Sequence, residues 1–220
     1  MTEIIIPIKE LSSAKQRLNP VLNADERADL VLAMLQDLLS AVTEAGRGRV
    51  LVVASDDAVF DLARQFDVRP IREREVRGYN AAVSLGFGNA GDGNVAVLPG
   101  DLPLATADRI RCLCAPAASD SRCIRLAASH DQMGTNGLFL ASAGLIRPGF
   151  GLNSLARYQR AARTIGVEPF LVDAPGLALD IDTPRDLRAL SQCAYRGETS
   201  RFLDRIGDRL RQPSLCRGAA

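Results

Sequence analysis

The sequence is short of histidine, which narrows the chemistry that the chain can perform. His130 is the only histidine among 220 residues. A metal site built on several imidazoles is excluded, because such a site needs two or more histidines. A Ser-His-Asp triad would have to use His130, and no G-x-S-x-G motif supports one. The reactive groups must therefore be sought among carboxylates, hydroxyls and cations.

Long apolar runs are also missing. No run reaches the roughly 18 residues that a bilayer-spanning helix needs. The first residues lack a basic segment followed by an apolar one and a cleavage site, so we expect no signal peptide and a cytoplasmic protein. In that compartment the five cysteines are expected to be reduced thiols. The net charge of +1 gives no indication of a nucleic-acid or membrane partner.

Lysine is nearly absent, and its two copies lie close together. Of the 27 cationic side chains, all but Lys9 and Lys15 are arginines. With Arg17, these lysines form a cationic loop after the first predicted strand, and a compact ammonium group suits a phosphate. The loop has no glycine, so it is neither a Walker A loop nor a dinucleotide-binding fingerprint. The alternative is a charged loop that faces solvent and holds no ligand.

Apolar strands alternate with amphipathic helices along most of the chain. This alternation is typical of an α/β fold. We expect one Rossmann-like domain over residues 1–192, with a mostly parallel central sheet and helices on both faces. Strands are predicted at residues 3–9, 49–54, 68–71, 95–99, 122–128, 137–141 and 167–172, and a turn at 175–176. Helices are predicted at residues 24–45, 57–65, 81–88, 106–114, 154–166 and 184–192.

Residues 193–220 are predicted to be a C-terminal helical tail. Phe202, Leu203, Ile206 and Leu210 lie on one face of an amphipathic helix of about three turns. We expect this helix to dock weakly, either on the domain or on a second copy of the chain in a homodimer. The last eight or so residues are expected to be unstructured.

Three aspartates follow apolar segments at positions suited to a ligand site. Asp101 follows the strand predicted at 95–99 and so lies at its carboxyl end. In an open α/β sheet, ligands bind at the edge formed by the carboxyl ends of the strands. Asp180 and Asp182 are two residues apart, so in an extended segment both side chains point the same way. Neighbouring carboxylates repel unless a proton or cation separates them, and oxygen ligands suit Mg²⁺ bound with a phosphate. In the plainer alternative, Asp101 and Asp182 each only cap the helix that follows.

Six short motifs occur in order over residues 3–192. Together they resemble the CofC/FbiD family, guanylyltransferases that act on small phosphorylated acids in coenzyme F-420 biosynthesis and are related to the MobA-like nucleotidyltransferases. The motifs are Ile6-Pro7-Ile8-Lys9 with Ala14-Lys15-Gln16-Arg17-Leu18, then Gly78-Tyr79-Asn80-Ala81-Ala82, Leu98-Pro99-Gly100-Asp101-Leu102-Pro103-Leu104, Gly134-Thr135-Asn136, Phe150-Gly151-Leu152-Asn153-Ser154 and the segment 175–184.

The resemblance implies a Mg²⁺-dependent enzyme with GTP as co-substrate and a phosphorylated acid as acceptor. The implied metal ligands are Asp101, Asp180 and Asp182, with Asp101, Lys15 and Arg17 supporting the transfer. The positions implied for GTP are Lys9, Asn80 and Pro99, and those for the acid are Thr135, Gly151 and Ser154. From the residues alone, Asn80 either caps a helix or reads a base edge.

The acid implied is 2-phospholactate, phosphoenolpyruvate or 3-phosphoglycerate, and the sequence does not choose among them. Two other functions stay open. One is a MobA-like or sugar-phosphate nucleotidyltransferase with another acceptor, which the absence of glycine from the first loop disfavours. The other is a non-catalytic nucleotide-binding module, which the retention of all three aspartates and the cationic loop disfavours.

Overall fold

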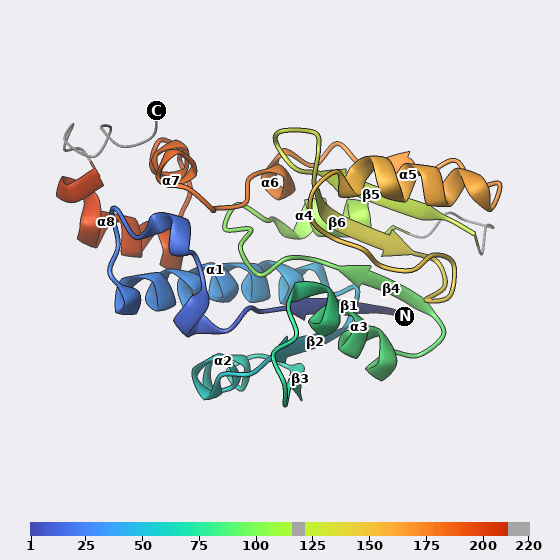
Figure 1. Ribbon diagram of the computed structural model, residues 1–220, viewed down its shortest axis with the longest axis horizontal. Coiled ribbons are helices and arrows are strands. Elements are labelled where there is room, and N and C mark those ends of the chain that lie inside the picture. The colour runs from blue at the N-terminus through green and yellow to red at the C-terminus, as the bar shows by residue number, and fades with distance from the viewer. Residues whose placement is uncertain (116–121, 211–220) are drawn as a thin grey trace.

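The computed structural model describes residues 1–115 and 122–210. Its strands are β1 (Thr2–Pro7), β2 (Gly48–Ala54), β3 (Val68–Arg72), β4 (Asn94–Val97), β5 (Ile124–Ala128), β6 (Thr135–Leu140) and β7 (Phe170–Leu171). Its helices are α1 (Ala24–Ala45), α2 (Asp57–Ala63), α3 (Tyr79–Asn89), α4 (Ala107–Leu113), α5 (Ser154–Thr164), α6 (Pro175–Ala178), α7 (Pro184–Ser191) and α8 (Glu198–Leu210). Two short 3-10 turns, η1 (Leu11–Ser13) and η2 (Gln16–Leu18), follow β1 (Figure 1).

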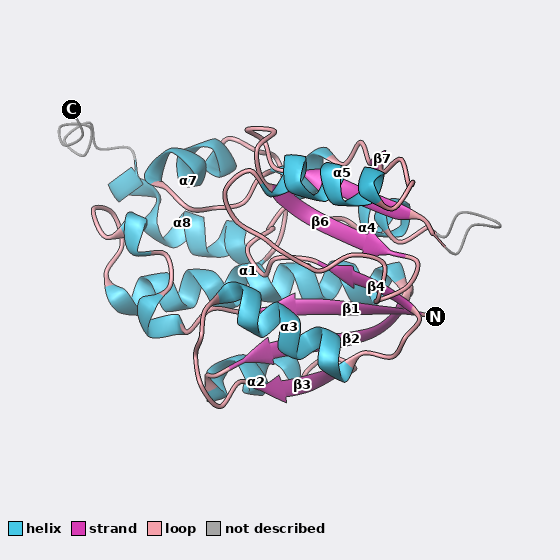
Figure 2. Cartoon of the chain, turned by 45° about the vertical axis from the view of Figure 1, so that its right-hand side comes forward, coloured by secondary structure: helices cyan, strands magenta, loops and turns pink. Residues whose placement is uncertain are grey.

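The strands form one sheet in the order β3-β2-β1-β4-β6-β5-β7. β1 runs parallel to β2 and β4, β2 to β3, and β5 to β7. β6 is antiparallel to both of its neighbours, β4 and β5. The opposite directions of β4 and β6 can be followed in Figure 2. The predicted α/β fold with a mostly parallel sheet is therefore confirmed. Because β6 runs the other way, its first residues lie beside the carboxyl ends of β1 and β4.

Side chains that alternate along the strands build a core on each face of the sheet. Ile4 and Ile6 of β1 pack in a cluster with α1, α2, α4, α7 and α8. Ile5 packs in a second cluster with α3 and α5. Residue Gly86 lets α3 lie close to β1, because a Cβ there would meet Ile5 Cγ2 at 2.4 Å. Helices thus cover both faces, as the alternating apolar pattern predicts.

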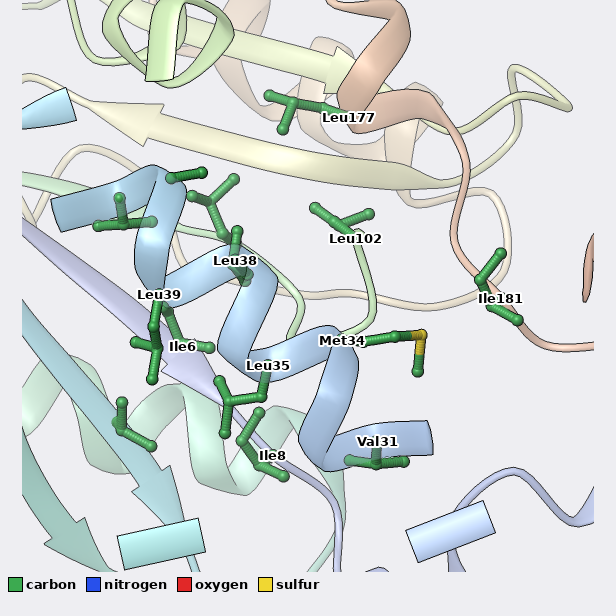
Figure 3. Close-up of a cluster of buried hydrophobic side chains, with 14 of the residues drawn as sticks. Ile6, Ile8, Val31, Met34, Leu35, Leu38, Leu39, Leu102, Leu177 and Ile181 are labelled. Carbon is green, nitrogen blue, oxygen red and sulfur yellow. The ribbon is translucent and has the colours of Figure 1, made fainter. Parts of the chain in front are cut away.

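Helix α1 begins and ends where its sequence predicts. Asn23 accepts a hydrogen bond from the backbone N–H of Glu26, whose carboxylate accepts one from the N–H of Asn23. Gly46 ends the helix in the left-handed conformation, at φ +61°. Between these caps, Leu35 and Leu38 lie in the buried cluster drawn in Figure 3. α1 is therefore a fixed support for the loop that precedes it.

Helix α8 docks firmly within the chain, which corrects the expectation of weak docking. Phe202, Leu203 and Ile206 are buried in the same cluster as α1. Asp37 of α1 accepts hydrogen bonds from the first backbone N–H groups of α8, at 2.7 and 2.9 Å. These three side chains of the predicted apolar face are thus buried within the chain itself, while the side chain of Leu210 lies outside the described part. The expectation of unstructured final residues concerns positions outside the described ranges.

Several local predictions differ from the structure. β7 is only two residues long, Phe170–Leu171, within the strand predicted at 167–172. Pro175 and Gly176 open the short helix α6 instead of forming a simple turn, with proline at its favoured first position. Asn80 does not cap α3, since Gly78 is the N-cap and Asn80 lies in the first turn. β6 begins at Thr135, two residues earlier than predicted.

The cysteines that the structure describes, Cys112, Cys114, Cys123 and Cys193, are free thiols, as expected. Burial raises the pKa of the Cys114 thiol to about 12. Over residues 1–115 and 122–210, none of the helices has the length and apolar character that crossing a membrane would require.

Candidate active site

A cleft of about 1200 Å³ opens at the carboxyl ends of β1 and β4 and the start of β6. All of the predicted site residues line it: Lys9, Lys15, Arg17, Asn80, Pro99, Asp101, Thr135, Gly151, Ser154, Asp180 and Asp182. They come from six separate segments of the chain. The sheet order brings these segments to one edge, as expected for a ligand site in an α/β fold.

Lys15 links two of the three aspartates. Its Nζ lies 2.5 Å from Asp101 Oδ2 and 2.8 Å from Asp182 Oδ1, and Arg17 Nη1 lies 3.8 Å from Asp182 Oδ2. Burial of Lys15 would lower its pKa, but the charges of both carboxylates and their hydrogen bonds raise it above its ordinary value. Lys15 is therefore a buried, protonated cation.

Side chains from other segments fix the backbone of the cationic loop. Lys15 itself is in the left-handed conformation, at φ +52°, which a residue with a Cβ adopts at a cost in free energy. Arg27 of α1 is buried beneath the loop and donates to the carbonyls of Ala14 and Leu22, at 3.2 Å each. The Asp56 carboxylate accepts a hydrogen bond from the N–H of Leu11. The loop is thus a fixed element of the cleft wall.

The other carboxylates have contrasting environments. Burial raises the pKa of Asp180, and the nearby charges of Asp101 and Asp182 add to this, although a 3.1 Å hydrogen bond from Asn136 opposes it. Burial would also raise the pKa of Asp182. The charge and hydrogen bond of Lys15 outweigh that effect and lower it, with help from Lys9 and Arg17. Negative charge is therefore compensated at Asp182 and poorly compensated at Asp180.

Neither Asp101 nor Asp182 acts as a helix cap, so the plainer alternative is wrong. Thr106 is the N-cap of α4 and accepts a hydrogen bond from the N–H of Arg109. Thr183 is the N-cap of α7, in a capping box with Asp186. Both helix starts are satisfied by these threonines, and the two aspartates face the cleft.

The donor set fits a divalent cation in its chemistry. Among the described residues, no three His, Cys, Asp or Glu side chains are already grouped as a metal site. Even so, three carboxylates line the cleft, and Asp101 Oδ1 is buried without a protein partner. The raised pKa of Asp180 also marks negative charge that a cation would stabilise. Oxygen donors of this kind are those that Mg²⁺ prefers.

Two buried hydroxyls line the cleft where β6 and α5 begin. Thr135 Oγ1 and Ser154 Oγ have no hydrogen-bond partner, although Ser154 is only 1% exposed. They lie at the starts of β6 and α5. Gly151, at φ +114°, shapes the loop just before Ser154. A buried hydroxyl without a partner is costly unless a ligand or water completes it, so this part of the cleft is suited to a small polar ligand.

Asn80 connects α3 to the loop that precedes α5. Its amide donates to the carbonyl of Phe150 at 3.1 Å and accepts from the N–H of Phe150 at 2.8 Å. Arg157 donates to the carbonyls of Gly149 and Phe150, and Tyr158 accepts from the N–H of Gly149. The loop that carries Gly151 is thus fixed from both α3 and α5.

Sequence reasoning missed four residues that shape the cleft: Arg27, Asn136, Arg157 and Tyr79. Asn136 lies inside the Gly134-Thr135-Asn136 motif, so the motif could have pointed to it. Arg27 lies on the apolar face of the helix predicted at residues 24–45. An arginine on such a face could have been predicted to be buried. The hydroxyl of Tyr79 is buried without a partner. Burial is the main cause that raises the pKa of Tyr79 well above its ordinary value, and the charge of Asp101 adds to it.

Comparison of the fold with solved structures places it among nucleotidyltransferases. A nucleotidyl transferase from Methanothermobacter thermautotrophicus superposes with a TM-score of 0.65 at 17% identity, covering 93% of this chain and 99% of that one. A cytidylyltransferase from Leptospira borgpetersenii gives a TM-score of 0.56 at 14% identity, covering 100% and 98%. At these identities the likeness concerns the fold alone.

The sequence has much nearer relatives. A phosphoenolpyruvate guanylyltransferase from Rubrobacter xylanophilus is 36% identical over 189 residues, which are 84% of this chain and 91% of that protein. A 3-phospho-D-glycerate guanylyltransferase from Phenylobacterium zucineum is 36% identical over 219 residues, 96% of this chain and 99% of that protein. Residues 2–213, including α8, match the family described as guanylyl transferase CofC like. The chain therefore belongs to the CofC-like guanylyl transferase family.

Proposed function

We propose that this protein is a Mg²⁺-dependent guanylyltransferase that joins the GMP of GTP to a small phosphorylated three-carbon acid and releases pyrophosphate. The observation that carries the proposal is a single cleft lined by two different sets of groups. One set is a cation held among carboxylates, and the other is two buried hydroxyls without partners. Relatives named for phosphoenolpyruvate and 3-phospho-D-glycerate support the class of acceptor.

The triphosphate is assigned to the cationic side chains of the cleft. Lys9, Lys15 and Arg17 line it, and Arg185 at the start of α7 adds a further cation. Their charges would stabilise the triphosphate and the pyrophosphate that leaves. Asn80 and Pro99, which also line the cleft, are assigned to the nucleoside. The hydroxyls of Thr135 and Ser154 would donate hydrogen bonds to the carboxylate or phosphate of the acid.

The reaction is an in-line displacement at phosphorus. A phosphate oxygen of the acid attacks the α-phosphorus of GTP and forms a new P–O bond. The bond between the α-phosphorus and the oxygen that bridges to the β-phosphorus breaks, and pyrophosphate leaves with the electron pair. The attacking phosphate is already anionic, so no general base is needed. The chain contributes positioning and neutralisation of charge.

Asp101, Asp180 and Asp182 are the residues that would hold Mg²⁺. When bound, the ion would neutralise charge on the phosphates. Asn136 keeps the Asp180 carboxylate oriented toward the cleft through its 3.1 Å hydrogen bond. The placement of the enzyme in coenzyme F-420 biosynthesis rests on the family to which the chain belongs.

The test is a direct assay with three acceptors. The protein is incubated with GTP, Mg²⁺ and either 2-phospholactate, phosphoenolpyruvate or 3-phosphoglycerate, and pyrophosphate release is measured. Mass spectrometry of the guanosine diphospho-acid identifies the product. ATP and CTP in place of GTP measure nucleotide selectivity. Release with at least one acid is expected, and no release with any of the three would refute the proposal.

A further inference from the structure

Lys15 contacts two of the three carboxylates that would hold the proposed metal. Lys15 Nζ is in hydrogen-bond contact with Asp101 Oδ2 and Asp182 Oδ1, at 2.5 and 2.8 Å. These are two of the three carboxylates that would hold Mg²⁺. An ammonium group and a divalent cation repel each other strongly at such distances inside a protein. Each of the two cations therefore weakens the binding of the other to this carboxylate pair.

We propose that Lys15 is the resident counter-ion of the Asp101–Asp182 pair in the free protein and leaves it for the phosphates when metal and nucleotide bind. The inference rests on the proposed function for the identity of that nucleotide. In the free protein the lysine side chain is 9% exposed, so it is withdrawn from solvent and held by the two carboxylates.

The backbone around Lys15 favours such an exchange. Its left-handed conformation, at φ +52°, is maintained between the turns η1 and η2. The two ion pairs offset the cost of that conformation while the cleft is free of ligand. The four-carbon stem of a lysine can swing its ammonium from carboxylate to phosphate without moving the loop, which Arg27 holds in place.

This exchange couples the binding of the metal to the binding of the nucleotide. Without a nucleotide, a metal must displace Lys15 from the carboxylates and leave the buried ammonium without a partner. With the triphosphate present, the ammonium gains new anionic partners as it leaves. The nucleotide therefore raises the affinity for the metal, and by linkage the metal raises the affinity for the nucleotide by the same factor.

The test measures Mn²⁺ binding by electron paramagnetic resonance, with neither GTP nor acid present. Lys15→Met should bind Mn²⁺ on the order of tenfold more tightly than the unmodified protein, since the competing charge is gone. Lys15→Gln, a second neutral variant, should do the same, while Lys15→Arg keeps the charge and the weak binding. The matched control is Lys9→Met, which removes the same charge from the same cleft. Lys9 makes no hydrogen bond or ion pair with Asp101 or Asp182 in the described structure, so its loss should change the affinity much less.

A second readout is the melting temperature with and without Mg²⁺. Lys15→Met leaves the carboxylates without their counter-ion, so Mg²⁺ should raise its melting temperature more than that of the unmodified protein. Unchanged or weaker Mn²⁺ binding by both neutral variants, or equal tightening in Lys9→Met, would overturn the proposal. These measurements involve no turnover, so a failure here is distinct from a failure of guanylyl transfer.

Discussion

At the scale of single residues, Asp101 combines two properties that a structural aspartate would not show. One carboxylate oxygen pairs with Lys15, and the other is buried without a protein partner. An acceptor left in this state costs free energy, which a bound cation or water would recover. Asp101 is therefore better explained by a ligand than by the stability of the chain.

Asp101→Asn should lower guanylyl transfer by on the order of a hundredfold or more while the protein stays folded. The amide is nearly the same shape but lacks the charge that binds a cation and pairs with Lys15. Pyrophosphate release gives the rate, and thermal unfolding followed by circular dichroism reports on the fold. Asp108→Asn, an exposed acid of α4, is the control and should keep full activity. Near-normal turnover by the Asp101 variant would remove it from the metal site.

Thr135→Val and Ser154→Ala should each raise the KM for the acid by roughly tenfold and leave the KM for GTP unchanged. Their hydroxyls have no protein partner, so removing them should cost little stability. Steady-state kinetics and urea unfolding measure the two effects separately. Ser40→Ala, in which a hydroxyl of α1 is removed, should change neither KM. A rise in the KM for GTP instead would place the acid elsewhere.

The chemical groups of the site were predictable from the sequence, but their partners were not. Asp101, Asp180 and Asp182 could be found because each follows an apolar segment or belongs to a short motif. The hydrogen bond between Asn80 and Phe150 joins residues 70 positions apart in the sequence, and no local sequence pattern encodes such a contact. Likewise, the clustering of Lys9 and Lys15 indicated a phosphate site without showing that Lys15 binds carboxylates in the free protein.

At the scale of elements, the sequence predicted most of the helices and a mostly parallel sheet, but not the reversed direction of β6. The boundaries of α1 follow from a capping box and a glycine, which act within a few residues. The reversed direction of β6 depends on its pairing with β4 and β5. An apolar run in the sequence indicates a buried strand but does not indicate in which direction the strand will pair. Its N-terminal end, with Thr135 and Asn136, reaches the cleft only because of that reversal.

The loop over residues 11–18 is an element whose position depends on one buried arginine. Arg27→Met should destabilise the protein by roughly 1–3 kcal/mol, since the carbonyls of Ala14 and Leu22 lose their donor. The loop should also exchange its amide hydrogens faster, and the KM for GTP should rise. Urea unfolding and hydrogen-exchange mass spectrometry test this. Arg64→Met, which removes an exposed arginine, is the control, and equal exchange in both variants would contradict a supporting role for Arg27.

At the scale of the whole molecule, the core extends beyond the predicted domain. The family match runs to residue 213, and α8 contributes to the same buried cluster as α1 and the sheet. The amphipathic pattern of α8 was visible in the sequence, but the pattern does not say which surface the helix covers. That surface is α1, whose Asp37 also satisfies the N-terminus of α8.

Phe202→Ala should therefore destabilise the entire protein, by about 3–5 kcal/mol. Phe202 is 2% exposed, so the truncation leaves a cavity between α8 and α1. A single urea transition shifted to lower concentration is expected. The neighbouring Arg201→Ala changes an exposed side chain and should leave the midpoint nearly unchanged. A separate early transition confined to α8 would show that the tail folds as an independent unit.

The bond between Lys15 and Asp182 has a consequence for the order in which the protein matures. The two residues are 167 positions apart, and every strand of the described sheet precedes Asp182. Contacts that close so long a loop form late, because chain entropy is lost before they contribute. A nascent chain can thus complete its sheet while the cleft still lacks the Asp182 carboxylate. Under the proposed function, catalytic activity would then require the finished molecule, and a fragment that ends before residue 182 would lack it.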